Sequence, residues 1–139
     1  LLKLQKLHPH EYVIKCCREE LLTENYFHAV HEAAKSLEDR VKTMSELSLS
    51  GTKLFDAVFC TSSSILALNS LRTDTEKNQQ NGFREMLNGV YHMYRNVTAH
   101  ELKIKWMISE SDALDALKII SVLHYLLDQC VIVPKSEKN

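Results

Sequence analysis

The feature that most limits the fold is a long helical pattern in residues 26–44. Apolar side chains recur there at spacings of three, four and seven positions, which places them on one face of an α-helix. That face consists of Tyr26, Phe27, Val30, Ala33, Ala34, Leu37, Val41 and Met44. The pattern predicts a helix that begins near residues 23–25 and buries this face in a core.

Four other segments have helical patterns. The first begins at Pro9 and continues through residues 11–22, and a short helix is predicted for residues 52–60. Thr73 and Glu76 form a capping-box pattern before a long helix over residues 76–96. Ser109 and Asp112 mark the start of a last helix over residues 112–130. The sequence predicts a polar break between helices over residues 45–51, which ends at Gly51. It predicts an ordered connection over residues 61–71.

These segments together predict an all-α bundle of four main helices plus a short one. Gly and Pro are scarce, three and two among 139 residues, as expected for a mostly helical chain. We expect one domain over residues 1–139, with the 75–96 and 110–129 helices packed together and no β-sheet. Because the sequence begins with Leu1, we expect it to be the C-terminal part of a longer protein.

Two glycines interrupt the long helix at Gly82 and Gly89, seven positions apart and hence on nearly one face. Each costs a helix interior about 1 kcal/mol relative to alanine. We expect another backbone to approach closely there, either within the subunit or across a two-fold axis.

Charge and composition exclude several classes of protein. The net charge of -1 gives no overall basic field, so binding of nucleic acid would need a local patch. No apolar run approaches the ~20 residues of a membrane span, and no signal peptide is visible. The cysteines lack the spacing of metal ligands, which favours reduced thiols in a cytoplasmic protein. They are Cys16, Cys17, Cys60 and Cys130.

The sequence RNVTAH, residues 95–100, contains an arginine and a histidine five positions apart. Because each helical residue turns by about 100°, an unbroken helix would place Arg95 and His100 on different faces. The β-branched Val97 and Thr98 weaken the helix, so a turn over residues 96–99 could bring both side chains together. Arginine matches the oxygens of a phosphate ester, and histidine can accept and return a proton near neutral pH.

A polar row precedes this motif on the long helix. Arg84, Asn88 and His92 lie on the same side as Arg95 if the helix is regular. Lys103 and Lys105 follow the motif, so these cations predict a local positive patch. We take Arg84, Asn88, Lys103 and Lys105 as candidate substrate-binding residues. An ordinary solvated helix face is the alternative for the row.

RNVTAH resembles the R-x4-6-H motif of HEPN domains, including a polar residue, Asn96, directly after the arginine. The run EKNQQNGFREMLNGVYHMYRNVTAHE, with LFDAVF before it and SDALDALKIISVLHYLLDQC after it, resembles the phage- and defence-associated Ymh-like group of that superfamily. The similarity extends from LHPHEYV to Cys130.

The resemblance implies a two-fold homodimer in which two motifs face each other and cleave RNA without a metal or other cofactor. It implies that Arg95 holds the scissile phosphate, that Asn96 orients the motif or substrate, and that His100 transfers a proton. It also implies a role in toxin–antitoxin, abortive-infection or anti-phage systems, with an antitoxin or a linked effector domain as partner. Leu102 stands where adenylylated relatives have tyrosine, so that regulation is not supported.

Two alternatives remain at the level of sequence. His28 and His31 are three positions apart on one helix and could chelate a metal, but no third ligand has an evident spacing. The chain could also be a non-catalytic HEPN module that binds nucleic acid or dimerises for a missing effector domain. The second histidine that RNA cleavage needs would come from a second subunit or, less well placed, from His92.

Overall fold

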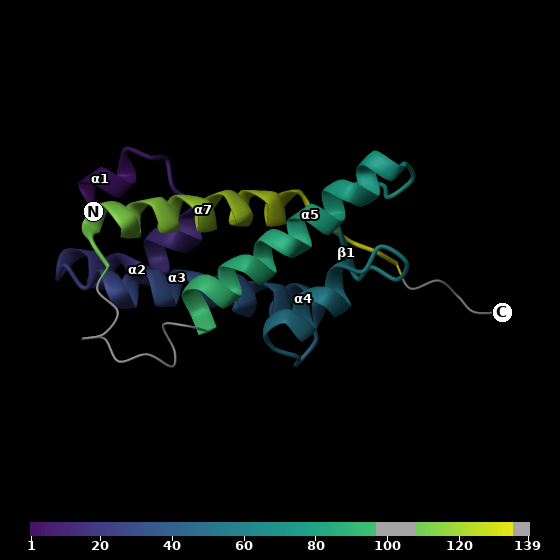
Figure 1. Ribbon diagram of the computed structural model, residues 1–139, viewed down its shortest axis with the longest axis horizontal. Helices are drawn as coiled ribbons and strands as arrows, with labels where there is room; N and C mark the ends of the chain where they lie inside the picture. The colour runs from purple at the N-terminus through teal and green to yellow at the C-terminus, as the bar shows by residue number, and fades with distance from the viewer. Residues whose placement is uncertain (97–107, 135–139) are drawn as a thin grey trace.

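The computed structural model describes residues 1–96 and 108–134. Its helices are α1 (Leu2–Gln5), α2 (Glu11–Leu22), α3 (Tyr26–Ser45), α4 (Gly51–Phe59), α5 (Asp74–Val90) and α7 (Glu110–Gln129), with a π-helix η1 (Tyr91–Asn96) that continues α5. In Figure 1, α7 runs horizontally through the upper part of the view, below α1; α2 and α3 lie below α7, and α5 crosses the bundle diagonally. The predicted all-α bundle is confirmed.

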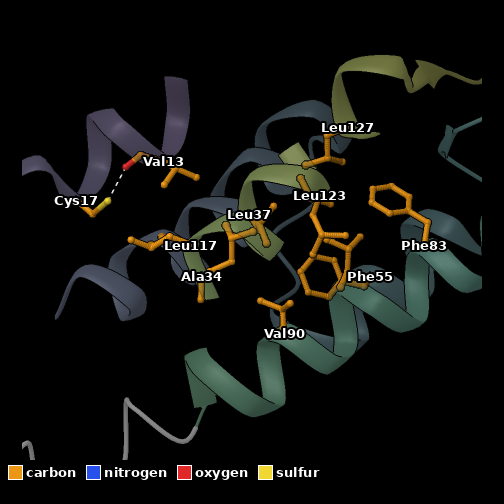
Figure 2. Packing of buried hydrophobic residues seen from close by; sticks show 14 of the residues in the cluster. Val13, Cys17, Ala34, Leu37, Phe55, Phe83, Val90, Leu117, Leu123 and Leu127 are labelled. Atoms are coloured by element: carbon orange, nitrogen blue, oxygen red, sulfur yellow. Dashed lines mark hydrogen bonds between the residues drawn. The ribbon is translucent and has the colours of Figure 1, made fainter. Parts of the chain in front are cut away.

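The centre of the bundle is α3, which packs against α2, α4, α7 and η1. Its predicted apolar face is buried as expected, except that Tyr26 and Met44 are only partly covered. Figure 2 shows side chains from α3, α4, α5 and α7 meeting in one core. The labelled residues of that part are Ala34, Leu37, Phe55, Phe83, Val90, Leu117, Leu123 and Leu127. The α5 and α7 helices also touch each other, as predicted.

Most helix starts follow the predicted capping residues. Thr73 Oγ1 accepts a hydrogen bond from the Glu76 amide at 3.0 Å, and Glu76 Oε1 accepts one from the Thr73 amide at 3.0 Å, which completes the capping box. Ser109 caps α7 by accepting from the Asp112 amide at 3.0 Å. The predicted start at Pro9 is two residues too early. His10 is the N-cap of α2, because its Nδ1 accepts from the Tyr12 amide at 3.1 Å.

A small sheet corrects the expectation of a sheet-free fold. Strand β1 (Leu66–Ala67) pairs antiparallel with β2 (Val131–Ile132), joining the predicted connection to the residues after α7. The fully buried side chain of Gln80 holds the other side of this connection. Its Oε1 accepts from the Leu68 amide at 3.0 Å, and its Nε2 donates to the Leu66 carbonyl at 2.9 Å. Strands this short have no sequence periodicity, so the pattern could not reveal them.

The expected close approach at Gly82 and Gly89 is wrong for the described part of the subunit. A Cβ atom added to either glycine would meet no described atom within 4 Å. The glycine with a close neighbour is Gly51 instead, at the start of α4. The contact across a two-fold axis stays a prediction.

Among the helices formed by residues 1–96 and 108–134, none combines the length and apolar character needed to cross a bilayer.

Candidate functional site

The candidate site lies where η1 ends against α3. The long helix changes from α-helical to π-helical geometry at Tyr91, and Arg95 lies near the end of the π-helical segment. π-Helical turns are rare and are frequently found at functional sites. The change also alters which way the last side chains point, so a helical wheel drawn from α5 does not place Arg95 correctly.

The Arg95 side chain is directed at α3, and 25% of its surface is exposed. Its Nη1 lies 3.0 Å from Nε2 of His31, and its Nε lies 4.0 Å from Oε1 of Glu38. His31 and Glu38 are seven residues apart on α3, so they lie two turns apart on one face. The guanidinium therefore contacts one helix on two sides, at hydrogen-bond distance from His31 and at a longer ion-pair distance from Glu38.

Glu38 also connects this site to the start of α4. It is buried, and its Oε2 accepts a hydrogen bond from the Gly51 amide at 2.7 Å. The N-terminus of a helix stabilises negative charge, so the carboxylate is compensated by α4 on one side and by Arg95 on the other. Tyr91 covers Gly51, whose φ of +60° is easily adopted only by glycine. One buried acid thus joins α3, α4 and η1.

Arg84 and Asn88, the predicted substrate-binding residues of α5, have a different partner. Arg84 Nη1 and Asn88 Nδ2 both donate to Oδ1 of Asp56 on α4, at 2.8 and 3.0 Å. These hydrogen bonds lower the pKa of the Asp56 carboxyl. The structure therefore brings Arg84 and Asn88 together, but it directs them to α4, whereas Arg95 is directed to α3.

Only some of the remaining predicted site residues lie in the part of the chain that the structure describes. Asn96 is the last residue of η1 and is partly exposed beside Arg95. His100, Lys103 and Lys105 lie outside the described residues. His92 is exposed on η1.

Sequence reasoning missed the part played by His31 and Glu38. The sequence relates His31 only to His28, as a possible metal-binding pair, and its pattern assigns no role to Glu38. Among the described residues, no group of three or more His, Cys, Asp or Glu side chains could hold a metal ion. The sequence signal that links His31 and Glu38 is their seven-residue spacing beside the apolar face of a helix. This spacing does not identify Arg95 as their partner.

A second polar cluster resembles a serine nucleophile with a histidine base, but its hydrogen bond runs in the wrong direction for that role. Ser36 Oγ lies 2.9 Å from Nε2 of His124, and Nη1 of Arg40 lies 3.1 Å from Nδ1 of the same ring. A guanidinium can only donate, so Nδ1 carries the lone pair and Nε2 carries the proton. His124 therefore donates to Ser36 and cannot accept its proton. Burial, followed by the charge of Arg40, lowers the pKa of His124 to about 3.

Comparison with known proteins assigns the chain to a family. The family model described as "Protein of unknown function (Hypoth_ymh)" matches residues 6–127, which is most of the chain. The chain belongs to the Hypoth_ymh family. The match confirms the resemblance to the Ymh-like group, and its range includes Arg95, Asn96 and His100. No curated protein and no solved structure is significantly similar to this Hypoth_ymh chain.

Proposed function

We propose that the chain is a HEPN-type endoribonuclease that cleaves RNA without a metal, through Arg95, Asn96 and His100. The observation that supports this best is the placement of Arg95. A partly buried guanidinium, hydrogen-bonded to His31 and within ion-pair distance of Glu38, lies at the end of a π-helix directly before the segment that contains His100. A cation held in this way can stabilise the charge of a phosphate in a transition state without reorganising.

The chemistry uses the substrate's own 2′-hydroxyl as nucleophile. Its oxygen attacks the adjacent phosphorus, the bond to the 5′-oxygen breaks, and a 2′,3′-cyclic phosphate and a free 5′-hydroxyl result. One group must accept the proton of the 2′-hydroxyl, and one must donate a proton to the 5′-oxygen. His100 fills one of these roles, while Arg95 binds the non-bridging oxygens of the phosphate.

A two-fold dimer would supply the second motif histidine. The outer face of α5 is suitable for such a contact. Gly82, Met86 and Gly89 lie four and three positions apart, Met86 is 45% exposed, and the space beside both glycines holds no described atom. An apolar face with small side chains lets a second helix approach closely. Since α5 leads directly into η1, a dimer formed there would bring the two motifs towards one axis.

The HEPN assignment also suggests a biological setting. We place the activity in toxin–antitoxin, abortive-infection or anti-phage defence, in the cytoplasm, with an antitoxin or a linked effector domain as partner.

The decisive experiment incubates the purified chain with mixed RNA in excess EDTA, beside a His100→Ala variant. The wild type should cleave RNA, and the variant should be slower by roughly 100- to 10,000-fold because it lacks the proton carrier. Circular dichroism should show that both proteins are folded. Cleavage that requires added metal, or that persists unchanged in His100→Ala, would contradict the proposal.

A non-catalytic HEPN module for RNA binding or dimerisation is the second candidate. The observation that favours it is the pairing of Arg84 and Asn88 with Asp56, which leaves less of the predicted cationic row for catalysis. Binding of RNA with no cleavage by the wild type, under the same conditions, would favour this candidate.

A further inference from the structure

The contact between His31 and Arg95 depends on the protonation state of His31. The Arg95 guanidinium is permanently charged and offers only N–H donors. A 3.0 Å contact between Arg95 Nη1 and His31 Nε2 is therefore a hydrogen bond only when Nε2 is unprotonated. The proton of the neutral ring is then on Nδ1, which lies 3.9 Å from Oε1 of Glu32.

The surroundings of His31 favour this neutral form. Its side chain is only 19% exposed, and burial, followed by the charge of Arg95, lowers its pKa. His28 and Lys35, on the same helix, act in the same direction, whereas Glu32 opposes them. From η1, the charged group that faces His31 among the described residues is Arg95 itself. Glu38, two turns along α3, faces the other side of the guanidinium.

We propose that His31 is a positioning residue, whose neutral imidazole fixes Arg95 in the geometry needed to bind a phosphate and whose protonation releases it. A proton on Nε2 would replace an attraction with two donors facing each other, 3.0 Å apart. Glu38 faces the Nε side of the guanidinium at 4.0 Å, so it does not replace the contact that His31 makes with Nη1. This inference rests on the proposed function, in which Arg95 binds the phosphate of the RNA.

His31 and His100 therefore have different tasks. His100 must gain and lose a proton in each turnover, whereas His31 must stay neutral throughout. The distinction predicts that His31 can be replaced by a side chain that accepts a hydrogen bond but does not titrate, such as glutamine. The same replacement at His100 would abolish catalysis.

The test that needs no RNA is an NMR titration of the histidine rings. The chain has seven histidines, and the resonance that is missing from His31→Gln identifies His31. The midpoint of the His31 titration should rise in Arg95→Met, because the neighbouring cation is removed. His92→Gln, an exposed residue on η1, is the matched control and should leave the His31 midpoint unchanged. An unchanged midpoint in Arg95→Met would overturn the proposal.

The position of Arg95 can be followed directly through its Nε–Hε resonance. While His31 is neutral, this signal should be sharp in the wild type and in His31→Gln and absent in His31→Leu. As the pH is lowered, the wild-type signal should disappear with the same midpoint as the protonation of His31. A signal that survives in His31→Leu would overturn the proposal. If RNA is cleaved, His31→Gln should retain most of the kcat, and His31→Leu should lose about tenfold. If RNA is not cleaved, the proposed function fails, while the NMR measurements still decide the role of His31.

Discussion

The ring of Tyr91 lies against Gly51, so closely that a Cβ atom on Gly51 would come within 2.7 Å of Tyr91 Cζ. The contact joins the first residue of η1 to the first residue of α4. Beside it, the Gly51 amide donates to Glu38, which also faces Arg95. The conformation of one glycine therefore affects how η1 presents the candidate site.

Replacing Gly51 by alanine should destabilise the fold by about 1–4 kcal/mol. The new methyl group would displace the Tyr91 ring, and alanine is strained at a φ of +60°. Urea unfolding followed by circular dichroism measures the effect. Ser50→Ala is the neighbouring control and should change stability by less than about 0.5 kcal/mol, because Ser50 makes no side-chain cap hydrogen bond. Equal stability of the two variants would show that Tyr91 does not depend on Gly51.

His124 should make the fold sensitive to acid. Its pKa is about 3 in the folded chain and near 6.5 in an unfolded one, so the unfolded state binds the extra proton between these values. Stability should therefore fall as the pH decreases from about 6.5 towards 3. His124 alone should contribute a loss of about 1–2 kcal/mol between pH 6 and 4.5.

Urea unfolding at several pH values between 4.5 and 7 tests this contribution. The free energy of unfolding should depend less steeply on pH in His124→Gln than in the wild type. At the acid end the difference in slope should correspond to nearly one proton taken up on unfolding. The slope is the relevant quantity, because His124→Gln also loses packing and is less stable at every pH. A slope equal to that of the wild type would mean that His124 is protonated in the folded state.

The sequence predicted the helices because their signals are local. Thr73, Glu76 and Ser109 act on amides a few residues away, and the capping bonds that they predict are all present. The sequence could not reveal the pairing of β1 with β2, since it joins two-residue strands far apart in the chain. It also could not show that Gln80 holds β1, because a buried glutamine on a helix looks like an ordinary polar residue.

The candidate site was predicted only in part, for a similar reason. The motif itself identifies Arg95, but the switch from α5 to a π-helix at Tyr91 changes the direction of Arg95. A regular helix placed Arg84, Asn88 and Arg95 in one row, whereas their partners lie on two different helices. Pairs such as Arg95 with His31 are separated by 64 positions, and no local pattern joins them.

The proposed dimer should depend on the outer face of α5. Gly89→Arg places a long charged side chain on an exposed position where an added Cβ meets no described atom within 4 Å, so the substitution should not disturb the subunit itself. We expect light scattering to show a dimer for the wild type at tens of micromolar protein, on the order of a weak-to-moderate association, and a monomer for Gly89→Arg. Glu19→Arg, an exposed charge change on α2, should remain dimeric. A wild type that is monomeric at this concentration would contradict the dimer.

Replacing Arg95 by lysine should abolish RNA cleavage even though the charge is kept. Lysine has a single ammonium group, so it cannot occupy the positions of both Nη1, bonded to His31, and Nε, near Glu38. It also cannot bind two phosphate oxygens in a planar, bidentate manner. We expect a loss of about 100-fold or more in kcat, comparable to removal of one donor to a developing oxyanion.

Arg84→Lys is the matched control for this substitution. Arg84 reaches Asp56 through one nitrogen at 2.8 Å, a contact that an ammonium group can also make, so this variant should retain most of the activity. Cleavage is measured on RNA in EDTA, and a DNA strand of the same sequence should stay intact because it lacks the 2′-hydroxyl. If Arg95→Lys cleaves as well as Arg84→Lys, the guanidinium geometry is not needed and Arg95 acts only as a charge. A product that ends in a 2′,3′-cyclic phosphate would identify the 2′-hydroxyl as the nucleophile in the wild type.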